Sequence, residues 1–283
     1  TSRWEERGYD EDFNDIIVDD LGTQLLTNPK FTYHNISLST GMIYELSKEN
    51  SLSFNYGLSS RPPNPSELFS DGLHHSAARI ELGDLRLNKE ISNRFGISYL
   101  LNSKKININI DTFLNYINDF IYLKPTGTES TIRGAYPVWE YFKTDALMMG
   151  IDTNLDYQFN ENWIIKTGFS YVYGQNTIED IPLIDIPSFR SNSSINYIIK
   201  NWNKLKISLA HEFVAKQIRY PNYNYETYIA TTDEFVEVDI STPPPSYNLF
   251  HLTGDATFSV NNKINLNLMI GINNLFNTSY REY

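Results

Sequence analysis

A repeated alternation of apolar and polar residues is the feature of this sequence that most limits its fold. Residues 104–120 read KKININIDTFLNYINDF, with apolar side chains at Ile106 and Ile108 and polar ones at Asn107 and Asn109. Successive side chains of a β-strand point to opposite faces of the sheet. The stretch therefore predicts a strand with one apolar face and one polar face.

The same alternation recurs along most of the chain. We predict ten strands, at residues 31–47, 51–60, 87–101, 105–123, 138–159, 163–178, 188–199, 204–219, 247–260 and 263–276. The 20 Tyr and 16 Phe residues also favour strands over helices. The predicted fold class is all-β.

The predicted connections are alternately short and long. Short polar turns stand at residues 47–50, 102–105, 160–162, 200–204 and 261–263, and long segments at 61–85, 124–137, 178–187 and 220–246. Strands of a soluble sandwich usually have about 5 to 6 residues, and a membrane-spanning strand needs about 9 to 11. The pattern predicts a transmembrane antiparallel up-and-down β-barrel, whose apolar rows face lipid and whose polar rows face a wet lumen. Aromatic residues near strand ends suit interfacial girdles, namely Tyr99, Tyr116, Tyr157, Trp163 and Trp202.

Composition narrows the function classes. The formal net charge of -11 argues against a nucleic-acid partner, because phosphates need Lys and Arg to neutralise them. With 0 Cys there is no disulfide framework and no thiolate site. No nucleophile elbow, His-Glu-x-x-His or phosphate loop is present, so we expect no enzyme activity. Neither a signal peptide nor an apolar run of about 20 residues appears.

Two separated motifs resemble those of TonB-dependent outer-membrane receptors. The first is GLSSRPPNPSELFSDGLHHSAARIELGDLRLNKEIS at residues 57–92. Its matching residues are Arg61, Pro62, Glu67, Leu68, Gly72, His74, Glu81, Gly83, Asp84, Leu87 and Glu90. The second is PSYNLFHLTGDATF at residues 245–258 followed by INNLFNTSYREY at residues 272–283, which is similar to the Asn-Leu-Phe-Asn signature near the end of such receptors.

The resemblance implies a domain organisation. Receptors of this family have an N-terminal plug, a TonB-binding segment and a barrel of about twenty-two strands. Residues 31–283 are then the C-terminal portion of the barrel, with roughly ten of its strands, and residues 1–30 an extracellular loop segment. We expect the plug and the early strands to lie outside this sequence.

The acidic run at residues 10–20 is not an EF-hand, because Asp15 stands where that loop needs Gly.

The resemblance also implies a function. We expect an outer-membrane receptor of a Gram-negative cell that imports a scarce nutrient, namely a metal complex such as an iron-siderophore, haem or zinc. The metal complex is cargo, and no intrinsic cofactor is expected. Its partners are the TonB-ExbB-ExbD energising complex, reached through the plug, and the lipid of the outer membrane. A self-contained ten-stranded barrel acting as an enzyme or adhesin is the alternative, followed by a passive porin.

Six residues are candidate ligand contacts at the outer mouth: Arg61, His74, His75, Arg79, Tyr223 and Tyr225. Imidazole is a metal ligand, which makes His74 and His75 the candidate metal site. Adjacent histidines on an extended chain point apart, so one metal would rarely use both. Arg61 suits an anionic ligand or an ion pair with Glu81 or Glu90. The tyrosines offer broad contact area to a hydrophobic chelate or a peptide.

Overall fold

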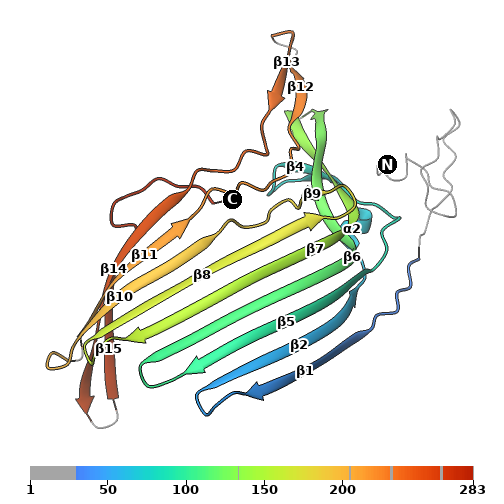
Figure 1. Cartoon of the computed structure of the whole chain (residues 1–283). Helices are drawn as coiled ribbons and strands as arrows, with labels where there is room; N and C mark the ends of the chain where they lie inside the picture. The colour runs from blue at the N-terminus through green and yellow to red at the C-terminus, as the bar shows by residue number, and fades with distance from the viewer. Residues whose placement is uncertain (1–29, 133, 204, 230–231, 262–263, 283) are drawn as a thin grey trace, which may run out of the picture.

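The main element of the chain is a wall of ten antiparallel strands (Figure 1). The computed structural model describes residues 30–132, 134–203, 205–229, 232–261 and 264–282, so the segment predicted as an external loop at residues 1–30 lies outside them apart from Lys30. In spatial order the wall strands are β1 (Ser37–Glu45), β2 (Asn50–Arg61), β5 (Glu90–Asn102), β6 (Ile106–Thr131), β7 (Gly134–Gln158), β8 (Trp163–Asn176), β10 (Arg190–Ile199), β11 (Leu205–Val214), β14 (Tyr247–Asn261) and β15 (Ile264–Ile272). The all-β, up-and-down prediction is confirmed, strand by strand.

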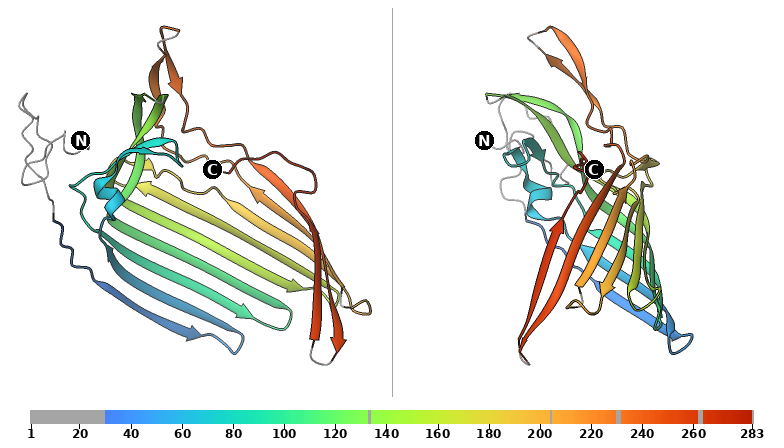
Figure 2. Two further views of the ribbon diagram at one scale, coloured as in Figure 1. Left: turned by 180° about the vertical axis from the view of Figure 1, so that it is seen from behind. Right: turned by 90° about the vertical axis from the view of Figure 1, so that its left-hand side faces the viewer.

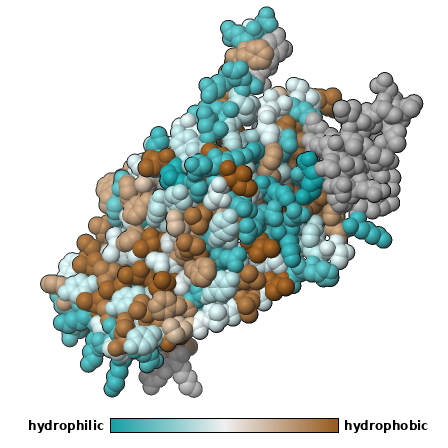
Figure 3. Space-filling view, turned by 45° about the vertical axis from the view of Figure 1, so that its right-hand side comes forward, coloured by the Kyte–Doolittle hydropathy of each residue, from teal (hydrophilic) through white to brown (hydrophobic). Residues whose placement is uncertain are grey.

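The strand register keeps the two faces of the wall separate. Phe95, Leu114 and Met149 lie in register on β5, β6 and β7, and they are 54%, 40% and 36% exposed. On the opposite face Asn109 lies beside Asn154. Figure 3 shows apolar side chains gathered over the part of the wall that is far from the protruding hairpin. Exposed apolar rows are what a lipid-facing wall requires, because the bilayer takes the place of a protein core.

The two ends of the wall differ in their connections. Tight turns join β1 to β2, β5 to β6, β7 to β8 and β10 to β11 at one end. The long connections at residues 62–89, 177–189 and 215–246 all lie at the other end, where the hairpin projects (Figures 1 and 2). The alternation predicted from the sequence is confirmed, and it places the six candidate mouth residues at the long-connection end.

The long connections are more ordered than the sequence predicted. Residues 61–85 hold a helix, α2 (Pro65–Phe69), and a hairpin of β3 (Asp71–His74) and β4 (Arg79–Leu82). Residues 220–246 hold the hairpin of β12 (Tyr225–Ile229) and β13 (Glu234–Val238), and β9 (Ile181–Pro182) pairs with β8. No strand was predicted in these segments, but short hairpin pairings supply their backbone hydrogen bonds.

The segment at residues 124–137 is not a loop. β6 and β7 continue through it as a two-stranded ribbon that pairs from Lys124 and Glu140 to Thr131 and Gly134. β4 adds to this ribbon in parallel, with Ile80 beside Val138. The ribbon, β4 and β3 thus form a small sheet beyond the end of the wall.

Small apolar cores hold the long-connection end together. One packs Leu68, Leu85 and Leu87 against Ile121 of β6. A second joins Ile80 and Leu82 to Val138, and a third joins Ile117 and Ala146 to Leu183. These cores fix the connections to the wall and to one another.

The wall is open rather than closed. β1 and β15 are the two ends of the strand order, and Figure 2 shows the wall curving from one to the other. The described part of the chain contains no helix of the length and apolarity that a bilayer crossing requires.

Candidate functional site: the outer mouth and the inner wall

Arg61 anchors the first long connection to the wall. It ends β2 opposite Glu90, and its Nε donates to Glu90 Oε2 at 2.7 Å. Its Nη1 donates to both carboxylate oxygens of Glu67 at 3.0 Å. The hydrogen bond to Glu90 is the main cause of the raised pKa of Arg61. The predicted pairing with Glu90 is confirmed, whereas Glu67 takes the place considered for Glu81.

Local sequence explains why Glu67 is available to Arg61. Asn64 caps α2 by accepting the Glu67 backbone N–H at 2.9 Å, and Glu67 Oε2 accepts the Asn64 N–H at 2.7 Å. Gly83 lies against this helix, where an added Cβ would come within 2.5 Å of the Leu68 backbone. The capping box holds the Glu67 carboxylate in place. Gly83, which follows β4, lets the chain pass close to the Leu68 backbone, where a side chain would not fit.

His74 and Arg79 meet at one carboxylate. Arg79 Nε donates to Glu81 Oε1 at 2.8 Å, and His74 Nδ1 lies 3.7 Å from the same oxygen. The Arg79 guanidinium also stands over the ring of Trp139, 4.9 Å from its centroid. His75 is exposed in the turn between β3 and β4. Within the described residues no three His, Cys, Asp or Glu side chains converge on a point that could hold a metal ion.

Tyr223 belongs to a half-buried cluster that joins two long connections to β6 and β7. Its phenol interacts with that of Tyr122, and burial is the main cause that raises the pKa of both hydroxyl groups. Lys124 Nζ lies 4.2 Å from the ring centroid of Phe142, 5.8 Å from that of Tyr223, and 3.8 Å from Glu179 Oε1. The cluster is therefore both aromatic and cationic.

The structure brings part of the predicted mouth together. Trp139 and Tyr223 line one cavity of about 60 Å³, and Arg79 stacks on Trp139. Tyr225 begins β12 opposite Val238, and burial raises its pKa. Sequence reasoning missed Lys124 and Trp139, because both fall at the margins of a segment that was interpreted as a loop. The available signal was the unbroken run of strand-forming residues Phe120–Leu123 that leads into Lys124.

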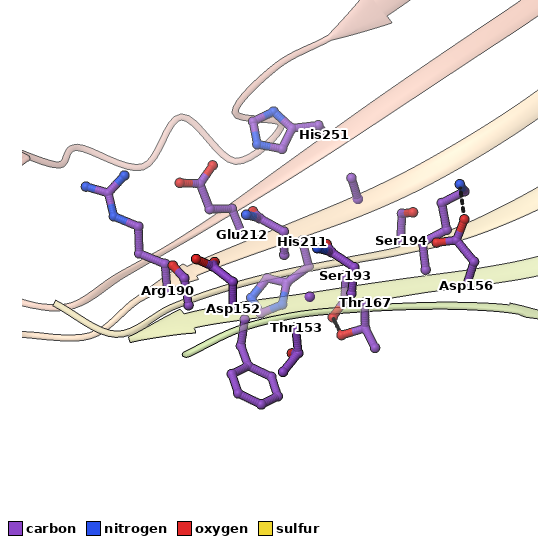
Figure 4. Close-up of a pocket in the computed structure, with 17 residues that line it drawn as sticks. Asp152, Thr153, Asp156, Thr167, Arg190, Ser193, Ser194, His211, Glu212 and His251 are labelled. Atoms are coloured by element: carbon purple, nitrogen blue, oxygen red, sulfur yellow. Dashed lines mark hydrogen bonds and ion pairs between the residues drawn. The ribbon is translucent and has the colours of Figure 1, made fainter. Parts of the chain in front are cut away.

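The inner wall carries two polar grooves. One of about 480 Å³ is lined by side chains of β7, β8, β10, β11 and β14, among them Asp152, Arg190, Glu212 and His251 (Figure 4). Lys166 Nζ and Asp156 form an ion pair at 2.6 Å beside it. A second groove of about 650 Å³ is lined from β1 to β7 and shares Asp152. The polar face that we predicted to line the lumen is thus the concave face of the wall.

Comparison with known protein families decides what this wall is. Residues 7–275 match the family model described as TonB dependent receptor-like, beta-barrel. The chain belongs to the TonB-dependent receptor family. This confirms the resemblance found in the two sequence motifs. No curated protein matches the chain.

Solved structures of other proteins have a fold similar to that of this chain. The copper transporter OprC superposes with a TM-score of 0.67 at 20% identity, over 86% of this chain and 34% of that one. The FrpB iron transporter from Neisseria meningitidis gives 0.56 at 16% identity, over 87% of this chain and 36% of that one. The siderophore receptor PirA from Acinetobacter baumannii gives 0.57 at 17% identity, over 85% and 36%. The chain spans about a third of the length of these structures.

Family membership sets the context of the mouth without assigning its ligand. In this receptor the six predicted contact residues lie at the long-connection end, and five of them take part in the contacts described above. Their role in ligand binding stays a prediction, as does a metal at His74 or His75.

Proposed function

We propose that the full receptor imports a scarce nutrient across the outer membrane of a Gram-negative cell, with energy from the TonB-ExbB-ExbD complex. The observation that carries the proposal is the two-faced wall, with exposed apolar rows outside and polar grooves inside. Such a wall satisfies its backbone hydrogen bonds within the sheet while it offers a wet path through lipid.

The proposed cargo is a metal complex: an iron-siderophore, haem or a zinc complex. The solved neighbours, which are a copper transporter, an iron transporter and a siderophore receptor, support this class. The mouth supports it independently, because Arg79 on Trp139 and Lys124 beside Tyr223 put cations next to aromatic faces. Planar or anionic chelates bind to such pairs through stacking and charge.

A growth and uptake assay tests the proposal. A strain that lacks the full-length receptor is complemented with it and supplied in turn with iron-siderophore, haem or zinc as the limiting source. Uptake of one labelled source is expected to need both the receptor and TonB. Uptake that continues after deletion of TonB would contradict the proposal and favour a passive channel.

The mouth residues provide a sharper test within the same assay. Trp139→Ala in the full-length receptor removes the ring under Arg79 and part of the wall of the cavity at Tyr223. We expect weaker binding of the imported complex, by about tenfold for the loss of one stacked ring. Trp202→Ala at the opposite end of the wall is the matched control and should leave binding unchanged.

A further inference from the structure

Among the residues that the structure describes, two buried donors on the inner wall lack a hydrogen-bond acceptor. Tyr247, the first residue of β14, is 6% exposed, and its hydroxyl forms no hydrogen bond within the described part of the chain. The same holds for the Nε of Arg190, the first residue of β10. Both side chains line one small cavity of about 10 Å³. A buried donor without an acceptor is destabilising, so the pair requires an explanation.

Arg190 differs from the other cations of the inner wall. Lys166 pairs with Asp156 at 2.6 Å and Lys206 with Asp255 at 2.8 Å, while the Arg94 guanidinium lies 4.2 Å from the Phe113 ring centroid. Among the residues that the structure describes, Arg190 forms no ion pair and no hydrogen bond. A guanidinium only donates, so an acceptor must come from elsewhere.

The neighbouring charges limit what that acceptor is. Arg190, Glu212 and Glu282 are the charged groups that act on the Tyr247 hydroxyl, and Arg281 lines the same cavity. The formal charges of two arginines and two nearby carboxylates cancel, so no surplus of positive charge would attract a polyanion, and any anion bound here is small and held by the donors themselves.

Arg190 lies between a small cavity that fits one oxygen atom and a wider groove that fits a larger group. A cavity of about 10 Å³ holds roughly one water-sized atom. Arg190 also lines the groove of about 480 Å³, where Figure 4 shows it next to Glu212 and below His251. An oxyanion can therefore place one oxygen in the cavity while its remaining atoms lie in the groove.

We propose that Arg190 and Tyr247 form a binding site for a small oxyanion, a carboxylate or phosphate group, on the inner wall of the receptor. One oxygen accepts hydrogen bonds from Arg190 Nε and from the Tyr247 hydroxyl. Arg281 adds positive charge at the cavity. The site does not depend on energised transport, and it would exist equally in a passive channel.

Titration of the full-length receptor in detergent tests the site. Inorganic phosphate and acetate are added at constant ionic strength, with chloride as the reference anion, and binding is followed by calorimetry. Tyr247→Phe keeps the ring and removes only the hydroxyl, and it should weaken binding by about tenfold, the usual effect of one hydrogen bond to a charged group. Arg190→Lys keeps the charge but removes the Nε donor, and it should weaken binding at least as much.

Tyr280→Phe is the matched control. The Tyr280 ring lies 4.7 Å from that of Tyr247, yet Tyr280 does not line the cavity, so binding should stay within about twofold of wild type. If Arg190→Lys fails to fold, Tyr247→Phe decides alone. The proposal is overturned if neither oxyanion binds, if Tyr247→Phe binds as wild type does, or if a crystal grown in phosphate shows only a water between the two donors. It is also overturned if an acidic side chain of the full-length receptor fills the site.

Discussion

Thr144 and Asn176 share a buried hydrogen bond across β7 and β8. Thr144 Oγ1 donates to Asn176 Oδ1 at 2.5 Å, and the two residues are 4% and 1% exposed. The same oxygen accepts the backbone N–H groups of Ile178 and Glu179 at 3.0 Å. Asn176 thus ends β8 and begins the connection at residues 177–189, in which Glu179 pairs with Lys124.

Replacement of Asn176 should loosen this end of the wall. Asn176→Ala leaves three donors without their acceptor, and we expect a loss of about 2 to 4 kcal/mol of unfolding free energy, measured by urea titration of receptor folded into vesicles. Thr144→Val removes a single donor and should cost about 1 kcal/mol. Equal costs for the two variants would show that Asn176 does not act as a shared acceptor.

Removal of the Arg61 cation should release the segment at residues 62–89. Arg61→Met leaves the Glu67 and Glu90 carboxylates, which are 9% and 12% exposed, without their cation. Because Arg61 itself is 43% exposed, we expect a loss of only about 1 to 3 kcal/mol, seen as faster limited proteolysis within this segment. Addition of Glu90→Gln should recover part of the loss.

An exposed ion pair gives the control for Arg61. Glu161 of the β7–β8 turn and Lys200 of the β10–β11 turn form an ion pair, with side chains that are 81% and 50% exposed. Lys200→Met should leave proteolysis unchanged, because water screens such a pair. Faster cleavage in both variants would mean that charge loss in general, and not the Arg61 anchor, controls the segment.

The wall was predictable because its signal is long and local. A period of two that persists through β6 and β7 cannot be mistaken for a helix, and a slip of one residue would turn every apolar side chain to the wrong face. The ribbon was not predictable, because Pro125, Gly127 and Pro137 are residues that end strands. The structure absorbs them in a register shift between Pro125 and Gly127, which only the partner strand reveals.

The candidate site was predictable only in part for a related reason. The residue type and the motif identified Arg61, His74 and Arg79, but their partners are set by tertiary contacts. Tyr223 meets Tyr122 about a hundred residues earlier in the chain, and no local pattern connects the two. α2 had a local signal, the Asn64 and Glu67 capping box, which was hidden among prolines.

A side chain at position 150 should destabilise the wall. Gly150 faces the inner wall, where an added Cβ would overlap the ring of Phe113, the ring on which Arg94 stacks. Gly150→Ala is expected to cost about 1 to 3 kcal/mol by urea titration, because it forces Phe113 out of place. Gly57→Ala, also on the inner face but with nothing within 4 Å, is the control and should be near neutral. A neutral Gly150→Ala would show that Phe113 moves freely.

Tyr122 should make the long-connection end sensitive to alkali. Burial is the first cause that raises the pKa of this phenol above its ordinary value of 10.0, followed by the charges of Tyr223 and Glu179. Above about pH 10 the unfolded chain loses this proton while the folded chain keeps it, so stability is complete below that pH and falls as pH rises further. Urea midpoints of the wild type should therefore drop more steeply between about pH 9 and pH 11.5 than those of Tyr122→Phe. Parallel curves would contradict burial of the phenol.

An arginine should destabilise the receptor to different extents at two adjacent residues of β11. Leu209 is 45% exposed on the apolar face, and Ala210 lines the polar groove on the other face. In a bilayer Leu209→Arg must place a guanidinium among acyl chains, at a cost of about 2 to 4 kcal/mol near the midplane, whereas Ala210→Arg meets water and should cost less than about 1 kcal/mol. Urea titration in vesicles measures both. A larger cost for Ala210→Arg than for Leu209→Arg in vesicles would show that the face assigned to lipid is the wrong one.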